Sequence, residues 1–579
     1  MANILAISSC SGHDSGAAII KDGNLVAAIE EERLNRIKHY FGFPQMSIEH
    51  CLKVAGLSHK DIDHVGISWQ PNAYTLRRIG FLFSFNSPKY FLRRLRFVTD
   101  ITRSGWNAQR MLKEMFQQAR IHCIEHHIAH ASSAFFASGF SEAAIMTMDG
   151  RGEWATMLLA AGEGKNIRKI KELYYPASLG IFYLAFTHYL GFDTHDEYKV
   201  MGLAPYGNPK YMDFFRKALK FSENTIVEMD LSLLQHPGYL PVAWGKKYFS
   251  DKVVSMLGPA RNPKEPMTQH HMDIAASLQA RFNEIGIDIA RYLRSLTGKE
   301  NLCLAGGVAF NSVMNWKIKD SGLFRNMFVQ PAAGDGGLSV GGALYIKNVI
   351  LGDDKAVSFD HAYWGSEYAE PEIQKEVETA RVEYIKLKDP SAAAATLLKE
   401  GNIIGWFQGR SEFGPRALGN RSILADPRKA ENKDIVNARI KFREEFRPFA
   451  PSILEEKVDD YFVNCKDKPS SYMLFVAPVK KGKEGVIPAV THVDGTGRVQ
   501  TVSRASNPRY YELIKRFGEL TGVPVVLNTS FNVKGEPIVN SPVDAMRCFY
   551  TTGLDYLIMG NFLLYKKPVS DAVRKEFAV

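Results

Sequence analysis

The sequence has 579 residues, too many for one hydrophobic core, and this length predicts two large domains. Hydrophobic residues make up 45% and charged residues 23%, the proportions of an ordinary globular protein, which excludes a disordered or fibrous chain. Lysines and arginines (72) exceed aspartates and glutamates (62), so the formal net charge is +10. This excess is either a solvated basic surface or, in part, the lining of a site for anions such as phosphates.

Several classes of protein are not expected from the composition. No uncharged apolar run is long enough to span a membrane. The first twenty residues lack a basic leader and a cleavage pattern, and no zinc-finger or RNP motif indicates nucleic-acid binding. The cysteines lie far apart without a CxxC pair, which is typical of buried thiols in a reducing cytoplasm. We therefore expect a cytoplasmic protein without a membrane span or a nucleic-acid partner.

The first predicted elements are a strand over 3–9 and, after a polar loop, two strands, 16–21 and 24–32, joined by a hairpin turn at Asp22-Gly23, because both central positions of such a turn favour positive φ. N-caps are predicted at Ser47 and Ser58, followed by a strand over 64–69. A second hairpin is predicted over 144–162, with its turn at Asp149-Gly150, and then a helix over 271–298 that Gly298 ends. The last elements predicted in this half are a strand–Gly-Gly turn–helix unit over 301–318 and a strand–glycine-rich loop–helix unit over 325–345.

A charged, irregular stretch with Pro371 and Pro390 predicts a domain boundary. We assign residues 1–352 to one domain, 353–390 to a linker and 391–579 to a second α/β domain. The second domain is predicted to contain strands over 402–409 and 523–532 and helices over 434–442 and 512–522.

Two histidines four residues apart open the stretch HHIAHASSAFF. Because residues i and i+4 share one face of a helix, His126 and His130 can converge on one metal ion, although such a pair also occurs in packed helices. Asp149 follows a predicted strand, and Asp335 lies in the glycine-rich loop AAGDGG. Two imidazoles with two carboxylates suit Fe2+, Mn2+ or Zn2+ better than Ca2+ or Mg2+.

Two further patterns in the first half indicate ligand contacts. A strand runs into Gly306 and Gly307 and then into a helix that begins near Asn311, which is either a common α/β turn or a phosphate site. His13 and Asp14 lie on the loop between the first two strands, as a polar turn or as groups that touch the reacting molecule. Lys199, before a Pro/Gly turn, is either solvated or a phosphate contact.

Basic residues in the second domain stand in glycine-, proline- and phenylalanine-rich stretches, where rigid loops suit bidentate phosphate contacts. The candidates are Arg416, Arg421, Lys441, Arg443, Arg447 and Arg498. Asn528 and Ser530 stand where a predicted strand ends, a usual place for ligands in α/β sheets.

Residues 71–97 interleave arginine and lysine with phenylalanine and tyrosine and match none of these patterns. They are either amphipathic helices over the core, or an insertion that lines an acceptor pocket or touches a membrane or a carrier protein.

Taken in order, the motifs HDSGAAIIKDGNLVAAIEEER, HHIAH, EYKVMGLAPYG, GGVAFN, GDGG, FGPRALGNRSILADPR, IKFREEFRPFAPS, HVDGTGRVQ and LNTSFN resemble the NodU/CmcH family of O-carbamoyltransferases. The resemblance runs nearly end to end. It implies an α/β protein with an N-terminal domain of the actin/hexokinase-like ATPase class (ASKHA) and a C-terminal YrdC-like α/β domain.

The resemblance also implies a two-step reaction. The C-terminal domain would make carbamoyl-adenylate from carbamoyl phosphate and ATP, with Mg2+, and the N-terminal domain would pass the carbamoyl group to a hydroxyl of a small-molecule acceptor. The implied metal is Fe2+, with Mn2+ or Zn2+ as alternatives, and the implied setting is antibiotic biosynthesis and other secondary metabolism.

The resemblance assigns roles to residues by motif position. His126, His130, Asp149 and Asp335 would be the metal ligands, and His13, beside Asp14, would contact the carbamoyl group. Gly306, Gly307 and Asn311 would hold the adenylate. Carbamoyl phosphate and ATP would be bound by Arg416, Arg421, Lys441, Arg447, Arg498, Asn528 and Ser530.

Three questions stay open at this stage. One alternative is a tRNA-modifying enzyme of the threonylcarbamoyl type, since both domains have relatives there, and another is a sensor module without turnover. Nothing in the sequence selects the acceptor, and the oligomeric state, a homodimer included, is also open.

Overall fold

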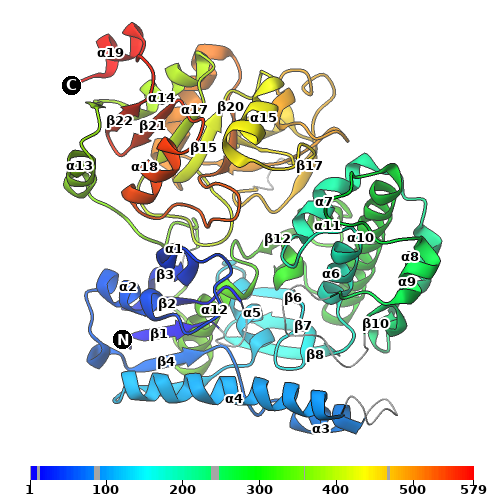
Figure 1. Ribbon diagram of the computed structural model, residues 1–579. Coiled ribbons are helices and arrows are strands. Elements are labelled where there is room, and N and C mark those ends of the chain that lie inside the picture. Colours follow the sequence, from blue (N-terminus) through cyan, green and yellow to red (C-terminus); the bar gives the residue numbers. More distant parts are fainter. Residues whose placement is uncertain (1, 9–12, 84–90, 236–246, 358, 466–469) are drawn as a thin grey trace. The chain divides into compact units, whose positions relative to one another are not determined.

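The computed structural model describes residues 2–8, 13–83, 91–235, 247–357, 359–465 and 470–579 (Figure 1). The chain forms two compact units. The N-terminal unit comprises Met1–Glu31 and His39–Phe359, and the C-terminal unit comprises Glu32–Lys38 and Asp360–Val579.

The N-terminal unit begins with a five-stranded sheet of order β3-β2-β1-β4-β5. Its strands are β1 (Ile4–Ile7), β2 (Gly16–Lys21), β3 (Asn24–Glu30), β4 (His64–Ile67) and β5 (Arg120–Cys123). The first three strands are antiparallel, and β4 and β5 run parallel to β1. The predicted hairpin at Asp22-Gly23 is confirmed, because both residues have positive φ.

A second sheet repeats this arrangement with the order β12-β11-β6-β7-β8. Its strands are β6 (Glu142–Met148), β7 (Ala155–Glu163), β8 (Asn166–Tyr174), β11 (Asn301–Ala305) and β12 (Asn326–Val329). Here too the first three strands are antiparallel and the last two run parallel to the first. The N-terminal unit is therefore built from two sheets of one topology, although the sequence shows no internal repeat.

The two halves are joined by an exchange of helices. Helix α5 (His126–Phe135) follows the first sheet but packs on β6, β7 and β11, whereas α12 (Leu338–Tyr345) follows the second sheet and packs on β1, β2 and β4. The two helices also pack on each other, and a side chain at Gly341 would collide with the carbonyl of Ala129. This close approach brings the start of α5 near the loop that precedes α12.

The other helices of the N-terminal unit are α2 (Gln45–Ala55), α3 (Thr75–Phe83), α4 (Phe91–Met115), α6 (Leu179–Tyr189), α7 (Glu197–Leu203), α8 (Met212–Ala218), α9 (Asp251–Leu257), α10 (Gln269–Thr297) and α11 (Ser312–Asp320), with a small β9–β10 hairpin (Leu219–Ser222 and Ile226–Met229). The predicted long helix and its Gly298 cap are confirmed, as is the capping box at Ser58. The N-cap predicted at Ser47 is wrong: α2 is capped by Pro44, and the Ser47 hydroxyl instead donates to Glu31. Among the described helices, none has the length and apolar character needed to cross a membrane.

The C-terminal unit is built on an eight-stranded mixed sheet of order β13-β22-β21-β14-β15-β20-β16-β19. Its strands are β13 (Tyr384–Lys386), β14 (Ile404–Phe407), β15 (Arg421–Ala425), β16 (Ala450–Leu454), β19 (Gln500–Val502), β20 (Val525–Ser530), β21 (Tyr556–Met559) and β22 (Phe562–Tyr565), and β17 (Val476–Pro478) pairs with β18 (Thr496–Arg498) apart from it. The helices are α13 (Glu370–Thr379), α14 (Pro390–Lys399), α15 (Glu431–Val436), α16 (Val458–Tyr461), α17 (Pro508–Thr521), α18 (Pro542–Tyr550) and α19 (Asp571–Phe577). Trp406, Tyr510 and Phe517 are buried in one core between this sheet and α14 and α17.

The range 353–390, predicted to be a linker, is partly built of regular elements. It contains α13 and β13, and β13 pairs with β22 of the main sheet. Pro371 lies in the first turn of α13, and Pro390 is the first residue of α14. Proline is well tolerated at the start of a helix, so these two prolines mark helix starts in the C-terminal unit.

A short segment from the N-terminal third of the sequence, Glu32–Lys38, belongs to the C-terminal unit. It contains most of α1 (Glu31–Asn35), and the Arg33 guanidinium, which is buried, donates to the Gly414 carbonyl. Arg36 donates to the carbonyls of Pro537 (2.9 Å) and Ile538 (2.6 Å). These contacts to backbone carbonyls fix the segment within the unit.

Candidate metal centre and anion site

Four side chains of the N-terminal unit converge as the sequence predicts. The ligand atoms of His126, His130, Asp149 and Asp335 all lie within 4.8 Å of one another, and all four residues are buried. Asp149 Oδ2 lies 2.9 Å from Nε2 of His130 and 3.4 Å from Nε2 of His126. Asp335 Oδ1 lies 3.7 Å from Nε2 of His126 and 3.8 Å from Nε2 of His130. Two imidazole nitrogens and two carboxylate oxygens therefore surround one point.

The fold explains why these residues meet. The histidines occupy the first turns of α5, Asp149 directly follows β6, and Asp335 lies in the turn that leads into α12. The buried Glu153 carboxylate accepts a hydrogen bond from the backbone N–H of His126 (3.1 Å), which holds the helix start in place. The exchange of α5 and α12 between the two sheets thus brings ligands from both halves together.

The charges of the four residues fit a divalent cation. Burial opposes an imidazolium at His130, but the carboxylates of Asp149 and Asp335 outweigh it and raise its pKa to about 9. Burial likewise opposes charge on Asp149, yet the two histidines hold the pKa of that carboxyl well below its usual range. A proton on His130 therefore compensates part of the negative charge of the two carboxylates. A divalent ion in place of that proton would compensate the charges of both Asp149 and Asp335. The donor set fits the predicted metal.

The predicted Gly306-Gly307 turn lies directly beside Asp149. Gly306 has φ +88°, and a side chain there would collide with the backbone carbonyl of Met148. A Cβ at Gly307 would lie 3.1 Å from Asp149 Oδ1. Asn311 caps α11 through the backbone N–H of Met314, and its amide also pairs with Gln279. Asn311 thus shapes the turn, and the two glycines leave open backbone next to the metal ligands.

His13 and Asp14 form a cluster with two histidines that the sequence analysis missed. The two oxygens of Asp14 lie 2.8 Å from Nδ1 of His13 and 2.8 Å from Nδ1 of His39. The ring of His195 lies against both, with centroids 4.3 Å from His13 and 4.2 Å from His39. Asp14, His39 and His195 all have positive φ, which is uncommon for residues other than glycine.

The histidine cluster is electrostatically linked to the metal centre. Burial lowers the pKa of His13, but the neighbouring Asp14 and the more distant Asp335 and Asp149 raise it to about 10. His13 is therefore a hydrogen-bond donor at neutral pH. Lys199, the other predicted contact in this region, lies 2.8 Å from Asp196 and is directed toward the ring of Phe192, so its ammonium already has a carboxylate partner.

Arginines of the C-terminal unit gather as predicted. Burial lowers the pKa of Arg498 well below its usual range, and the charges of Arg416, Arg443 and Arg447 lower it further. Within the described part of the chain, the buried Nε of Arg498 has no hydrogen-bond partner. Three like charges around a guanidinium with a buried, unsatisfied donor favour a bound anion.

Lys441 lies beside this arginine cluster at the end of β20. Its ammonium donates to the side-chain oxygen of Asn532 (2.8 Å) and to Ser530 Oγ (3.2 Å). Burial lowers the pKa of Lys441 well below its usual range, and Arg443 and Arg447 act in the same direction. The predicted Ser530 is therefore held by Lys441 at the strand end, with Arg443 fixed by Asn437 (2.7 Å).

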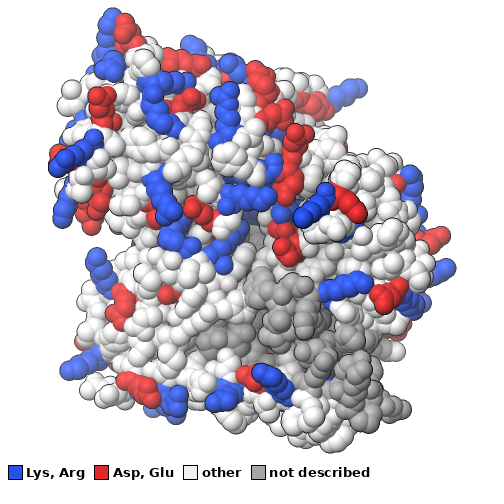
Figure 2. Space-filling view, in the orientation of Figure 1, with Lys and Arg blue, Asp and Glu red and all other residues white. Residues whose placement is uncertain are grey.

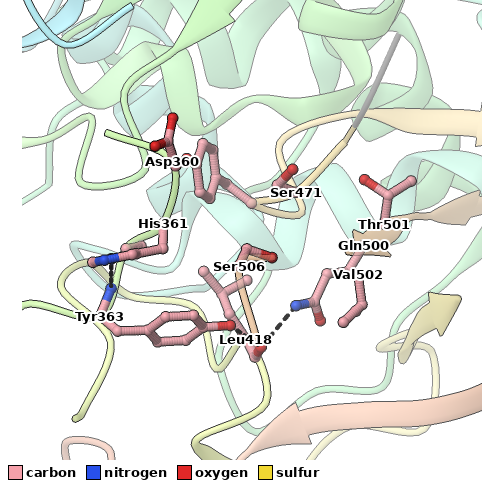
Figure 3. A pocket seen from close by; sticks show the side chains of 11 residues that line it. Asp360, His361, Tyr363, Leu418, Ser471, Gln500, Thr501, Val502 and Ser506 are labelled. Atoms are coloured by element: carbon pink, nitrogen blue, oxygen red, sulfur yellow. Dashed lines mark hydrogen bonds between the residues drawn. The ribbon is translucent and has the colours of Figure 1, made fainter. Parts of the chain in front are cut away.

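Asn528 lies on β20, two residues before Ser530, and is buried. Its amide donates to Gln500 Oε1 (2.9 Å) and Ser452 Oγ (3.1 Å). On the other side of Gln500 is a small pocket, where the Gln500 amide and the Tyr363 hydroxyl both donate to the Leu418 carbonyl, each at 2.8 Å (Figure 3). Asn528 thus belongs to a buried polar network that fixes the loop before β15.

Arg421 occupies a different environment from the one predicted. It lies on β15 inside the sheet, is fully buried, and its guanidinium stacks 3.7 Å from the Phe407 ring. It donates to four backbone carbonyls, those of Gln408, Asn420, Ser366 and Gly409 at 2.6 to 3.1 Å. Both terminal nitrogens are already used, and only the buried Nε lacks a partner among the described residues, so the structure gives Arg421 a structural role in place of an anion contact.

We therefore expect Arg421→Met to destabilise the C-terminal unit. Four buried carbonyls would lose a charged donor, a loss of about 3 kcal/mol or more, which lowers the midpoint of thermal unfolding by roughly 6–12 °C. Arg504→Met, at a side chain that is 65% exposed, should leave the midpoint nearly unchanged. A normal midpoint together with weakened nucleotide binding in Arg421→Met would instead support the anion role.

The comparisons with known proteins agree with this geometry. Residues 3–344 match the family described as Carbamoyltransferase N-terminus, and residues 395–566 match Carbamoyltransferase C-terminus. The chain belongs to the carbamoyltransferase family. It is an enzyme of the carbamoyltransferase type, which confirms the resemblance found in the sequence.

Relatives of this carbamoyltransferase include nodulation proteins of soil bacteria. It is 40% identical to Nodulation protein NolNO of Sinorhizobium fredii, over 98% of this chain and 81% of that protein. It is 43% identical to Nodulation protein NolO of Bradyrhizobium diazoefficiens, over 77% of this chain and 80% of that protein. Among solved structures, HypF of T. kodakarensis covers 60% of this chain and 48% of that chain, at 15% identity and a TM-score of 0.30.

Proposed function

We propose that this carbamoyltransferase makes carbamoyl-adenylate from carbamoyl phosphate and ATP in its C-terminal unit and transfers the carbamoyl group to a small-molecule hydroxyl in its N-terminal unit. The observation that carries the proposal is the convergence of His126, His130, Asp149 and Asp335 on one point. The acceptor in this proposal is a natural product or a sugar.

The arginine cluster of the C-terminal unit supports the first step. Carbamoyl phosphate and ATP together carry several negative charges, and these must be compensated before the two molecules can meet. Arg498 with its three arginine neighbours provides that compensation in a buried setting. Water would convert carbamoyl phosphate to carbamate and phosphate, and a carbamate oxygen would then displace pyrophosphate from the α-phosphorus of ATP, giving the adenylate.

The metal centre and the histidine cluster support the second step. A bound Fe2+, Mn2+ or Zn2+ ion would supply Lewis-acid chemistry by polarising the mixed anhydride and compensating the adenylate phosphate. The Gly306-Gly307 turn, which lies beside Asp149, would contact that phosphate through its backbone. His13, held by Asp14, would donate a hydrogen bond to the carbamoyl oxygen as the acceptor hydroxyl attacks.

We also propose the finer fold assignments that the sequence motifs imply. The two sheets of one topology in the N-terminal unit are those expected of an actin/hexokinase-like (ASKHA) domain. For the C-terminal unit we propose a YrdC-like fold, with the arginine cluster and the β20 end as its anion site.

The proposal is tested by incubating the protein with ATP, carbamoyl phosphate and Mg2+, with Fe2+ supplied anaerobically. Pyrophosphate should form only when carbamoyl phosphate is present. Label from [14C]carbamoyl phosphate should then appear on members of a panel of sugars and aminoglycosides but not on tRNA. If no pyrophosphate forms under these conditions, the proposed first step is wrong, and label on tRNA would favour the tRNA-modifying alternative.

A further inference from the structure

Helix α3 exposes apolar side chains to solvent on its outer face. Leu76 is 85% exposed, Phe83 is 72% exposed and Ile79 is 47% exposed. Their spacing of three and four residues places them on one face of the helix. Surface helices normally bury such a face, whereas α3 buries only Arg78 and Phe81, so these three apolar side chains are inverted toward solvent.

The inversion is fixed by arginines that point inward. Arg78 is only 3% exposed and donates to the Pro71 carbonyl (2.6 Å) and to Thr102 Oγ1 (3.2 Å). Arg94 of the neighbouring helix α4 is 2% exposed and donates to the Leu82 carbonyl (3.3 Å). Because burying a guanidinium is costly unless it is hydrogen-bonded, these contacts hold both helices in their present rotation. The apolar residues are thereby held outward.

Helix α4 continues this face with a mixture of apolar and basic residues. Leu92 is 74% exposed and Trp106 is 52% exposed. Of the described side chains on α3 and α4, the exposed basic ones are Arg77, Arg96, Arg103, Arg110 and Lys113, and the exposed acidic ones are Asp100 and Glu114. On the part of α4 that Figure 2 shows, both blue and red side chains stand among white ones. The exposed face is therefore apolar with an excess of positive charge.

We propose that the outer face of α3 and α4 docks on an anionic lipid bilayer. Exposed leucine, phenylalanine and tryptophan together with arginine and lysine are the composition of helices that lie in a membrane interface. The apolar tips would enter the headgroup layer while the guanidinium groups contact lipid phosphates. The protein would lie on the bilayer, in agreement with the absence of a spanning helix among its described residues.

The test is co-sedimentation of the full-length protein with phosphatidylcholine vesicles that contain or lack phosphatidylglycerol. The wild type should bind the anionic vesicles and release them at high salt. Leu76→Ser/Phe83→Ser should weaken this binding at least about tenfold, since two large apolar side chains would no longer enter the headgroup layer. Arg96→Gln/Arg103→Gln should also weaken binding about tenfold, and only for anionic vesicles.

A matched control changes exposed apolar residues elsewhere. Met256→Ser/Leu520→Ser, at side chains 54% and 42% exposed, should bind vesicles like the wild type. Unchanged thermal unfolding midpoints would show that all variants are folded. The proposal is overturned if the wild type binds neither vesicle or both equally. It is also overturned if the protein forms a dimer that Leu76→Ser/Phe83→Ser abolishes, because the face would then join two copies of the chain.

Discussion

Asp149→Asn is expected to abolish metal binding and carbamoyl transfer while leaving adenylate formation intact. Asp149 Oδ2 is the oxygen nearest to both imidazoles, at 2.9 and 3.4 Å, and the amide removes the negative charge at nearly constant shape. Loss of a residue that only orients a metal ligand already weakens binding about 10–100-fold, so loss of a direct ligand should weaken it at least about 100-fold. Metal content after loading with Fe2+ or Mn2+, measured by mass spectrometry, gives a readout that does not depend on activity.

The activity proposed for the C-terminal unit serves as an internal control for Asp149→Asn. Carbamoyl-phosphate-dependent pyrophosphate release should stay within about twofold of the wild type in Asp149→Asn, because Asp149 lies in the other unit. The matched control is Asp251→Asn, at a side chain that is 97% exposed, which should retain metal and both activities. A full metal complement in Asp149→Asn would refute the assignment of the centre. Loss of pyrophosphate release in a folded protein would refute the division of steps between the units.

The convergence of the four candidate metal ligands could be predicted because each of them carries a local signal. His126 and His130 show helical spacing, while Asp149 and Asp335 follow strands or glycine-rich loops, where side chains collect at a sheet end. His39 and His195 carry no such signal. His39 reaches Asp14, and His195 reaches the rings of His13 and His39, through backbone with positive φ at both residues, a conformation that histidine adopts too rarely to be inferred from its type. Only the three-dimensional path of the chain reveals this cluster.

Arg421 and the α3–α4 arginines show a second limit of sequence interpretation. The motif FGPRALGNRS places Arg416 and Arg421 in similar polar settings, but β15 lies in the interior of its sheet, which turns Arg421 toward backbone carbonyls. Arg78 and Arg94 are likewise inward although they stand among leucines and phenylalanines. Hydrophobic periodicity assumes that apolar side chains point inward, so it fails wherever an arginine finds enough carbonyl acceptors to be buried.

The duplicated topology of the N-terminal unit is also invisible in the sequence. The corresponding strands β2 (GAAIIK) and β7 (ATMLLAAGE) share only a small, apolar character, which many buried strands have. Strand pairing and the exchange of α5 and α12 are long-range features, and local patterns carry little information about them. The resemblance to a family supplied the expected architecture that the residue patterns alone did not.

Arg498→Met is expected to abolish pyrophosphate release without destabilising the protein. The guanidinium is partly exposed and lies among three other arginines, and its buried Nε has no partner within the described residues, so its position is unfavourable until an anion binds. Removing a positioned donor to developing charge typically costs about 100–1,000-fold in rate. The substitution also removes charge repulsion, so the midpoint of thermal unfolding should be equal to or higher than that of the wild type.

Ligand-induced stabilisation separates this role from a purely structural one. ATP with carbamoyl phosphate should raise the unfolding midpoint of the wild type, because an anion that binds the folded state stabilises it, and this increase should be lost in Arg498→Met. Metal content should stay unchanged, the converse of Asp149→Asn. The opposite stability effects expected for Arg498→Met and Arg421→Met follow from one physical difference: the guanidinium of Arg421 already donates to four carbonyls, whereas that of Arg498 is held among like charges. A fall in the midpoint of Arg498→Met comparable to that of Arg421→Met would show that both arginines stabilise the fold and that the anion is bound elsewhere.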